Sequence, residues 1–279
     1  MRAVVVTLFN HVPIPATEID TPFTIVPIEG KGQGVIARRF VSKGELVLAE
    51  PPLIVQSPRD MTPESIRLAL SQLPTAKQRE YLSLANCHRK AMHALLGIFQ
   101  TNSFPLGNSS ELTGERADQS GIFLQASRFN SSCLPNIIHV YDENTRKENL
   151  YAVKDIAEGE ELCVSYLAAL LFHPRAERRA VLERNFKFVC TCGACSLEGL
   201  ALQESDSRRE EIGRLYEEIG CGGNPREVLV KVGKCCPSAY HRNDIPFFDR
   251  SKERSHSWMK RVSIVTGRAS IMTASNSAS

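Results

Sequence analysis

Three cysteines crowd into six positions of this chain, Cys190, Cys192 and Cys195, and Gly193 lies among them. A glycine there allows the backbone to fold three thiolates around one centre. Thiols packed this closely would otherwise be prone to oxidation, so we expect a structural zinc site rather than a reduced cluster without an ion. Structural zinc usually has four ligands, and sequence spacing does not identify the fourth. The candidates for it are Cys87, Cys133, Cys163 and His173.

A second constraint is the stretch 128–136, which reads Arg-Phe-Asn-Ser-Ser-Cys-Leu-Pro-Asn. Asparagine tolerates unusual backbone angles and bonds to nearby main chain, so the stretch predicts a tight, self-bonded loop. Pro135 moves Leu134 out of the helical region, and the loop therefore does not continue a helix.

Composition limits the class of protein. At 279 residues the chain can form one large domain, or one domain with an appendage. The nine cysteines are too few for a secreted disulfide framework of this size, and the apolar run at 1–9 is too short to span a membrane and lacks a convincing cleavage site. We therefore expect a reducing, intracellular location, in the nucleus or the cytoplasm, without a membrane. A net charge of +3 is too mild to indicate nucleic acid.

The order of elements predicts a mixed fold. Short β-rich runs at 23–28, 35–37 and 46–50 are separated by glycine turns, which favours a folded-over β-structure. Helical patterns follow at about 63–73 and 76–99, and then a polar loop at 107–120. Runs at 137–141 and 150–153 predict a hairpin, 162–166 a strand, 174–186 a basic helix and 206–233 a pair of helices broken near 222–225.

Four motifs, in the same order along the chain, resemble those of the SET-domain family of protein-lysine methyltransferases. They are Gly32–Gly34, similar to the family's glycine motif; Arg128–Asn136, similar to its Arg-Phe-Asn-His-Ser-Cys-x-Pro-Asn loop; Gly159–Tyr166, similar to its Gly-Glu-Glu-Leu-x-x-x-Tyr strand; and Cys190–Cys195, similar to the post-SET Cys-x-Cys-x-x-Cys. Each is weak alone, but four in register over roughly 21–198 make a strong match. The chain is most similar to SMYD-like and fungal members, although no MYND zinc module is evident.

The resemblance implies an α+β fold: a SET β-fold of short strands with a helical insert, a post-SET zinc clamp and a short C-terminal helical segment. The implied boundaries are a leader at 1–20, the SET domain at 21–167 with its insert at about 60–125, the post-SET segment at 168–198, C-terminal helices at 199–236 and a disordered tail at 237–279.

The activity that the resemblance implies is methylation of a protein lysine with S-adenosylmethionine as the methyl donor. The partner would be a protein or peptide that presents a lysine, from a histone or another protein. By resemblance the cofactor pocket is formed by Lys31, Gly32, Gln33, Gly34, Asn102, Ser127, Asn130, Ser131, Tyr166, Phe186 and Phe188, and the zinc ligands are Cys133, Cys190, Cys192 and Cys195. Tyr166 matches the catalytic tyrosine. Composition alone would assign both phenylalanines to a core.

One departure from the family pattern is Ser131, which stands where the family usually has histidine. Serine loses the bulk and the second nitrogen of an imidazole. This departure leaves open a catalytically silent, zinc-containing interaction module as the alternative function. A zinc-stabilised nucleic-acid binder ranks last, because the basic residues are dispersed along the chain.

Overall fold

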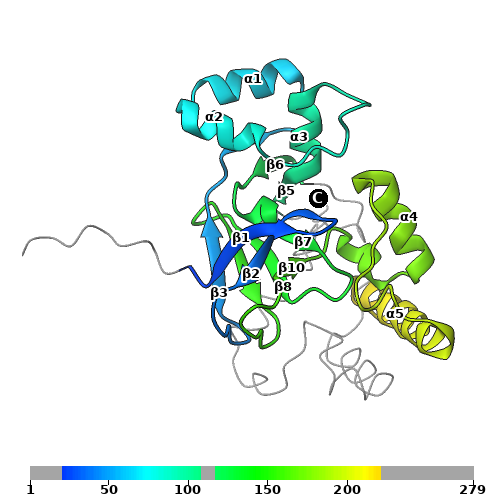
Figure 1. Cartoon of the computed structure of the whole chain (residues 1–279). Helices are drawn as coiled ribbons and strands as arrows, with labels where there is room; N and C mark the ends of the chain where they lie inside the picture. The colour runs from blue at the N-terminus through cyan, green and yellow to red at the C-terminus, as the bar shows by residue number, and fades with distance from the viewer. Residues whose placement is uncertain (1–20, 108–116, 221–279) are drawn as a thin grey trace, which may run out of the picture.

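The computed structural model describes residues 21–107 and 117–220; the predicted leader and tail lie outside them. Figure 1 shows short strands at the centre, a group of helices at one end, and further helices at one side. This mixture of helices and short strands confirms the predicted α+β class. Among the described residues, no helix is both long and apolar enough to cross a bilayer.

Along the chain, groups of strands alternate with groups of helices. The strands are β1 (Phe23–Ile28), β2 (Gly32–Ala37), β3 (Leu46–Glu50), β4 (Ile54–Gln56), β5 (Ser103–Leu106), β6 (Gln119–Ile122), β7 (Asn130–Ser131), β8 (Ile137–Asp142), β9 (Lys147–Ala152) and β10 (Cys163–Val164). The α-helices are α1 (Pro63–Ser71), α2 (Thr75–Leu82), α3 (Ala94–Asn102), α4 (Arg175–Phe186) and α5 (Gly199–Gly220), and the 3₁₀ turns are η1 (Ala126–Arg128) and η2 (Ala168–Phe172).

The strands form small sheets rather than one large sheet. β1 and β2 make an antiparallel hairpin, β3-β9-β8 and β4-β6-β5 are three-stranded, and β7 pairs with β10 in parallel. The hairpin turn needs Gly30 and Gly32, whose φ angles are 72° and 77°, because this region is costly for residues with a Cβ. The predicted hairpin around 137–153 is confirmed as β8 and β9.

Two apolar clusters fix the position of the strands relative to the insert. The first lies among the central strands, and Phe23 and Phe129 meet there edge to face at 5.6 Å. The second lies beneath α1–α3 and includes Ile66, Tyr81 and Phe99, all with no exposed surface. The hydroxyl of Tyr81 donates to the carbonyl of Leu95 at 2.7 Å, so this buried polar group is satisfied.

The insert corrects two sequence predictions. Its helical part ends at Asn102, and β5 and β6 continue it in a small sheet in which β6 pairs with both β4 and β5. The single helix predicted at 76–99 is also wrong, because α2 ends at Leu82 and α3 begins at Ala94. The reason is local: the side chain of Asn86 accepts the N–H of His88 at 2.9 Å, which offers the backbone an alternative to the helix.

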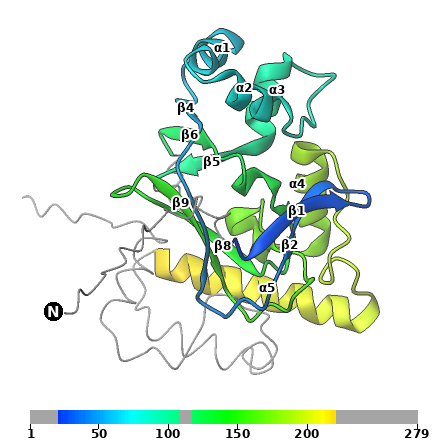
Figure 2. The ribbon, with the colours of Figure 1, turned by 60° about the vertical axis from the view of Figure 1, so that its left-hand side comes forward.

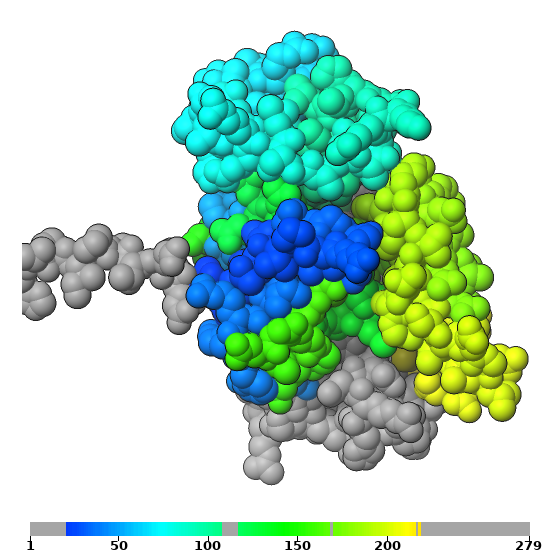
Figure 3. All heavy atoms as spheres, viewed as in Figure 1, coloured from blue at the N-terminus to red at the C-terminus, as the bar shows by residue number. Residues whose placement is uncertain are grey.

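The helices after the SET-like strands are one basic helix and one long helix. α4 matches the prediction closely, whereas α5 begins at Gly199, earlier than the predicted start at 206, and runs without a break to Gly220. The predicted break at 222–225 lies outside the described residues. Figures 1 and 2 both show α4 and α5 next to each other, and the space-filling view in Figure 3 shows them beside the strands, with the insert above.

Candidate active site and metal centre

The central loop is held by a parallel strand pair. Asn130 and Ser131 (β7) lie opposite Cys163 and Val164 (β10), and the N–H of Ser132 donates to the carbonyl of Val164 at 2.8 Å. The side chain of Asn136 closes the loop, since its Oδ1 accepts the N–H of Cys163 at 2.7 Å and its Nδ2 donates to the carbonyl of Glu161 at 2.8 Å. Two segments about thirty residues apart are thereby joined. The sequence predicted a loop bonded to itself, whereas the side chain of Asn136 bonds to the distant segment that contains Glu161 and Cys163.

Tyr166 lies just after β10 and is fixed at both ends. Its hydroxyl donates to the carbonyl of Phe129 at 2.9 Å, and its backbone N–H donates to Oγ of Ser131 at 3.2 Å. The ring of Phe186, from the end of α4, packs on the tyrosine ring with centroids 4.8 Å apart. Burial raises the pKa of Tyr166, so the phenol stays neutral near pH 7.

The glycine hairpin reaches the same region through Glu161. Nζ of Lys31 pairs with Oε2 of Glu161 at 2.6 Å, and Nδ2 of Asn130 donates to the other carboxylate oxygen at 2.9 Å. Partial burial disfavours the Lys31 ammonium, but the hydrogen bond and charge of Glu161 outweigh this, and the pKa of Lys31 is raised. Sequence reasoning assigned no role to Glu161, although the motif Gly159–Tyr166 contained it.

The glycines of the hairpin serve two different purposes. At Gly34 a Cβ would lie 2.5 Å from Cγ1 of Ile28 and 2.7 Å from Nδ2 of Asn130, so the absence of a side chain permits close packing. At Gly32 a Cβ would meet nothing within 4 Å, which leaves the backbone open to a ligand. Beside it, Lys31 and Glu161 offer one cation and one carboxylate, which suit the carboxylate and ammonium of an amino acid. The residues therefore fit the amino-acid end of S-adenosylmethionine.

Two predicted cofactor residues make side-chain contacts within the protein, Asn102 inside the insert and Ser127 from η1 to the insert. Nδ2 of Asn102 donates to the carbonyls of Ala85 and Ile98, both at 2.7 Å, and the side chain is buried. Oγ of Ser127 donates to the carbonyl of Asn102 at 3.1 Å. Since both polar groups are already used within the protein, we expect them to support the pocket wall rather than bind a ligand directly.

The four predicted metal ligands lie together. The sulfurs of Cys133, Cys190, Cys192 and Cys195 all lie within 4.8 Å of one another. The Cys133 sulfur is 4.0 Å from that of Cys190 and 3.5 Å from that of Cys195. Four sulfurs at the usual zinc distance of about 2.3 Å would be roughly 3.8 Å apart, so the spacing fits a tetrahedral ion. Hydrogen bonds among the four thiols lower the pKa of Cys195 and raise the pKa values of Cys133 and Cys190.

The alternatives for the fourth ligand have other surroundings. Sγ of Cys87 contacts Oγ1 of Thr101 at 3.3 Å, and Nδ1 of His173 pairs with Glu177 at 2.6 Å. Cys163 lies buried in β10. Of the four candidates left open by the sequence, Cys133 is the one whose sulfur joins the cluster. Phe188, two residues before Cys190, packs against this cluster together with Phe186.

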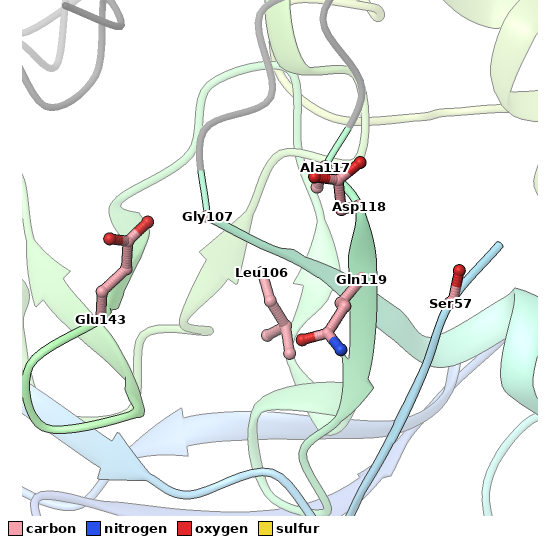
Figure 4. Close-up of a pocket in the computed structure, with 7 residues that line it drawn as sticks. All are labelled: Ser57, Leu106, Gly107, Ala117, Asp118, Gln119 and Glu143. Carbon is pink, nitrogen blue, oxygen red and sulfur yellow. The ribbon is translucent and has the colours of Figure 1, made fainter.

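A separate open depression lies over β5 and β6, and none of the predicted site residues lines it (Figure 4). Its lining residues are Ser57, Leu106, Gly107, Ala117, Asp118, Gln119 and Glu143. Two carboxylates at an open surface do not by themselves indicate a ligand, so we assign no function to it.

Comparison with known proteins gives a consistent result. Residues 32–167 match the family model described as "SET domain". The chain is 31% identical over 210 residues to the histone-lysine N-methyltransferase set5 of Schizosaccharomyces pombe, which covers 74% of this chain and 61% of that protein. It is 38% identical over 89 residues to the human protein-lysine N-trimethyltransferase SMYD5, covering 31% of this chain and 21% of that protein. The chain thus spans about three fifths or less of these relatives.

Proposed function

Because this chain belongs to the SET-domain family of lysine methyltransferases, we propose that it transfers a methyl group from S-adenosylmethionine to the side-chain amine of a lysine in a protein. The observation that carries the proposal is the fixed position of Tyr166 between the carbonyl of Phe129, the hydroxyl of Ser131 and the ring of Phe186. This arrangement holds a neutral phenol beside the loop that carries Asn130.

S-adenosylmethionine, when bound, supplies an electrophilic methyl group on a positively charged sulfur. We propose that the hairpin residues Lys31, Gly32, Gln33 and Gly34, with Asn130 and Ser131, hold its amino-acid end, while Phe186 and Phe188 cover its adenine. The pair formed by Lys31 and Glu161 provides complementary charges at that end. Cys133 connects the loop to the cysteine cluster next to Phe188, so the metal would clamp these aromatic rings over the pocket.

Tyr166 would orient the substrate amine. Because its hydroxyl donates its hydrogen to the carbonyl of Phe129, the lone pairs of the hydroxyl oxygen remain available. They can accept a hydrogen bond from the substrate amine or weak C–H···O contacts from a polarised methyl group. Its raised pKa rules out a phenolate base at neutral pH. In-line displacement depends chiefly on positioning, which a tyrosine held at both ends can provide.

The substrate amine must lose its proton before it attacks. From a reference pKa near 10.4, deprotonation at pH 7 costs about 4–5 kcal/mol. An apolar wall such as the ring of Phe186, next to a cationic sulfur, would lower the pKa of the substrate lysine and reduce this cost. The chain therefore needs a dry, oriented channel more than a strong base.

A direct test uses the purified protein with radiolabelled S-adenosylmethionine and a mixture of histones and other lysine-rich proteins. We expect label in at least one protein, and we expect Tyr166→Phe to lower turnover at least about tenfold while cofactor binding in calorimetry persists. Tyr151→Phe, on β9, is the matched control and should retain activity. Absence of cofactor binding at millimolar concentration by folded protein would overturn the proposal.

The second candidate function is a silent SET-like interaction module, which is motivated by Ser131. Such a module would keep the metal and bind peptides without transferring a methyl group. Methylation that disappears in Tyr166→Phe would exclude it, whereas cofactor-independent peptide binding without turnover would favour it.

A further inference from the structure

Several arginines of α4 and α5 contact the cysteine cluster and the backbone next to it. Arg179, on α4, donates from Nε to the carbonyl of Cys190 at 3.0 Å and from a terminal nitrogen to the carbonyl of Cys195 at 2.9 Å. Arg175, one turn earlier, donates to the carbonyl of Leu197 at 2.8 Å. These bonds hold the backbone of the cysteine segment against α4.

Arg178 is the most unusual member of this group, because its side chain is completely buried. One terminal nitrogen donates to the carbonyl of His173, and the other lies 3.9 Å from the sulfur of Cys195. The carboxylate of Asp206 is 3.5 Å away, and Nε has no hydrogen-bond partner among the described residues. A guanidinium cannot lose its charge in a protein, so burial at this position requires a compensating negative charge.

Arg209 approaches the cluster from the opposite helix, α5. Only 9% of it is exposed, and its two terminal nitrogens donate to the carbonyls of Cys133 at 2.8 Å and Leu171 at 2.7 Å. Cys133 is the ligand that the central loop contributes. Arg209 therefore connects α5 to the same residue that connects the active-site loop to the metal centre.

A metal-bound cysteine cluster would supply most of the negative charge that these arginines need. Four thiolates around one Zn²⁺ have a net charge of about −2, which, together with the Asp206 carboxylate 3.5 Å from Arg178, faces the charge of about +2 on the two buried guanidinium groups. Hydrogen bonds from outer groups to metal ligands and their backbone are known to orient the ligands. We propose that Arg178 and Arg209 are positioning residues of the four-cysteine centre, which neutralise its charge and couple metal binding to the docking of α5. This inference rests on the metal centre within the proposed function.

Other groups also hold α5 in place. Oδ1 of Asp206 accepts the N–H of Arg175 at 2.9 Å, and so α5 caps the first turn of α4, where Pro174 offers no side-chain cap. Gly213 permits a close approach, since a Cβ there would lie 3.3 Å from Cβ of Phe172. Leu215 adds one fully buried apolar side chain. Because Arg209 ties α5 to the carbonyl of Cys133, loss of the metal should loosen the helix.

The experiment measures zinc directly and does not depend on methyl transfer. Zinc content of the full chain is determined first, and then the rate at which a colorimetric chelator removes it. We expect Arg209→Met and Arg178→Met to release zinc about 10–100 times faster than the unmodified protein. Arg209→Lys, which keeps the charge and loses the forked geometry, should fall between. Arg208→Met, one position along α5 where the side chain pairs with Glu204 near the surface, is the control and should leave the rate unchanged.

Hydrogen exchange of α5 gives the second measurement, and it keeps the inference falsifiable if Arg178→Met does not fold. Removing zinc from the unmodified protein should increase exchange in 199–220, and Arg209→Met should do the same with zinc bound. A protein without zinc, an Arg209→Met variant that releases zinc at the unmodified rate, or an α5 whose exchange ignores the metal would each overturn the inference. Cofactor binding, measured separately, decides the proposed function.

Discussion

The hydroxyl oxygen of Ser131 accepts a hydrogen bond from the backbone N–H of Tyr166 over 3.2 Å. The family motif usually has histidine at the position of Ser131, and this difference was the reason to consider a catalytically silent module. Through this contact the serine helps to fix the residue that we propose to be catalytic. The departure is therefore compatible with an active enzyme.

Replacing Ser131 tests whether its hydroxyl positions Tyr166. Ser131→Ala removes the acceptor and leaves the N–H of Tyr166 without it, which should cost about 1 kcal/mol of stability and lower turnover roughly 2–10-fold. Ser131→Thr keeps a hydroxyl and should retain most of the activity. Initial methylation rates and thermal melting of both variants check the expectation. Equal rates for the alanine variant and the unmodified protein would contradict it.

Gly34 offers a test of close packing between the hairpin and the central loop. In Gly34→Ala the new methyl group would lie 2.5 Å from Cγ1 of Ile28 and 2.7 Å from Nδ2 of Asn130, so one side must shift. Overpacking of this kind costs about 1–3 kcal/mol, which corresponds to a melting temperature lower by roughly 3–10 °C. Gly193→Ala is the control. Although the sequence suggested that a glycine is needed there, its φ is not positive, and the nearest neighbour of a new Cβ would be 3.9 Å away. If both variants melt at similar temperatures, the hairpin moves to make room for the new methyl group at little cost in stability, and the prediction is wrong.

The features of the fold that depend on local residue patterns could be predicted from the sequence. The hairpin turn at Gly30 and Gly32 needs residues that adopt positive φ, and the glycines indicate it directly. The break between α2 and α3 was missed because it depends on one side-chain contact, Asn86 to His88, inside a helical pattern. Such a contact competes with the helix only weakly, and propensity does not reveal it.

The candidate site depended on contacts between distant segments, which spacing does not encode. Glu161 pairs with Lys31 across 130 positions, and Arg209 meets the carbonyl of Cys133 across 76. The resemblance to a family proposed roles for Cys133 and Tyr166 because both lie in motifs that can be recognised in the sequence. It gave no role to the arginines, because a basic helix is ordinarily read as a solvated surface.

The contacts of Glu160 should make the free energy of unfolding depend on pH in the acidic range. Partial burial disfavours its carboxylate, but the hydrogen bond and charge of Lys154, with a hydrogen bond from Asn136, lower its pKa below the usual 4.5. A lowered pKa in the folded protein means that the stabilisation is present above about pH 4.5 and is lost as the pH falls through the folded-state pKa. Because the pair is partly exposed, we expect less than about 1 kcal/mol.

The measurement compares Glu160→Gln with the unmodified protein at pH 7 and at about pH 3. The variant should unfold at a lower urea concentration at pH 7, and the difference should shrink as the pH falls below 4.5 and the unmodified carboxyl takes up its proton. Glu158→Gln, at an exposed position nearby, is the control and should show no difference at either pH. A deficit of Glu160→Gln that is equal at both pH values would contradict the assignment to charge.

Cys133 is the candidate fourth ligand whose sulfur lies beside those of Cys190, Cys192 and Cys195. Cys133→Ser removes a ligand that joins the active-site loop to the cysteine segment, so bound zinc should fall from about one ion per chain to almost none. We expect a loss of at least about 3 kcal/mol in stability, or roughly 6–12 °C in melting temperature. Cys87→Ser, which alters a thiol in contact with Thr101, should keep its zinc.

Metal analysis by mass spectrometry of the native proteins decides between them. If Cys163→Ser loses the ion and Cys133→Ser retains it, the fourth ligand is Cys163, and the link from the metal to the active-site loop through Cys133 is wrong.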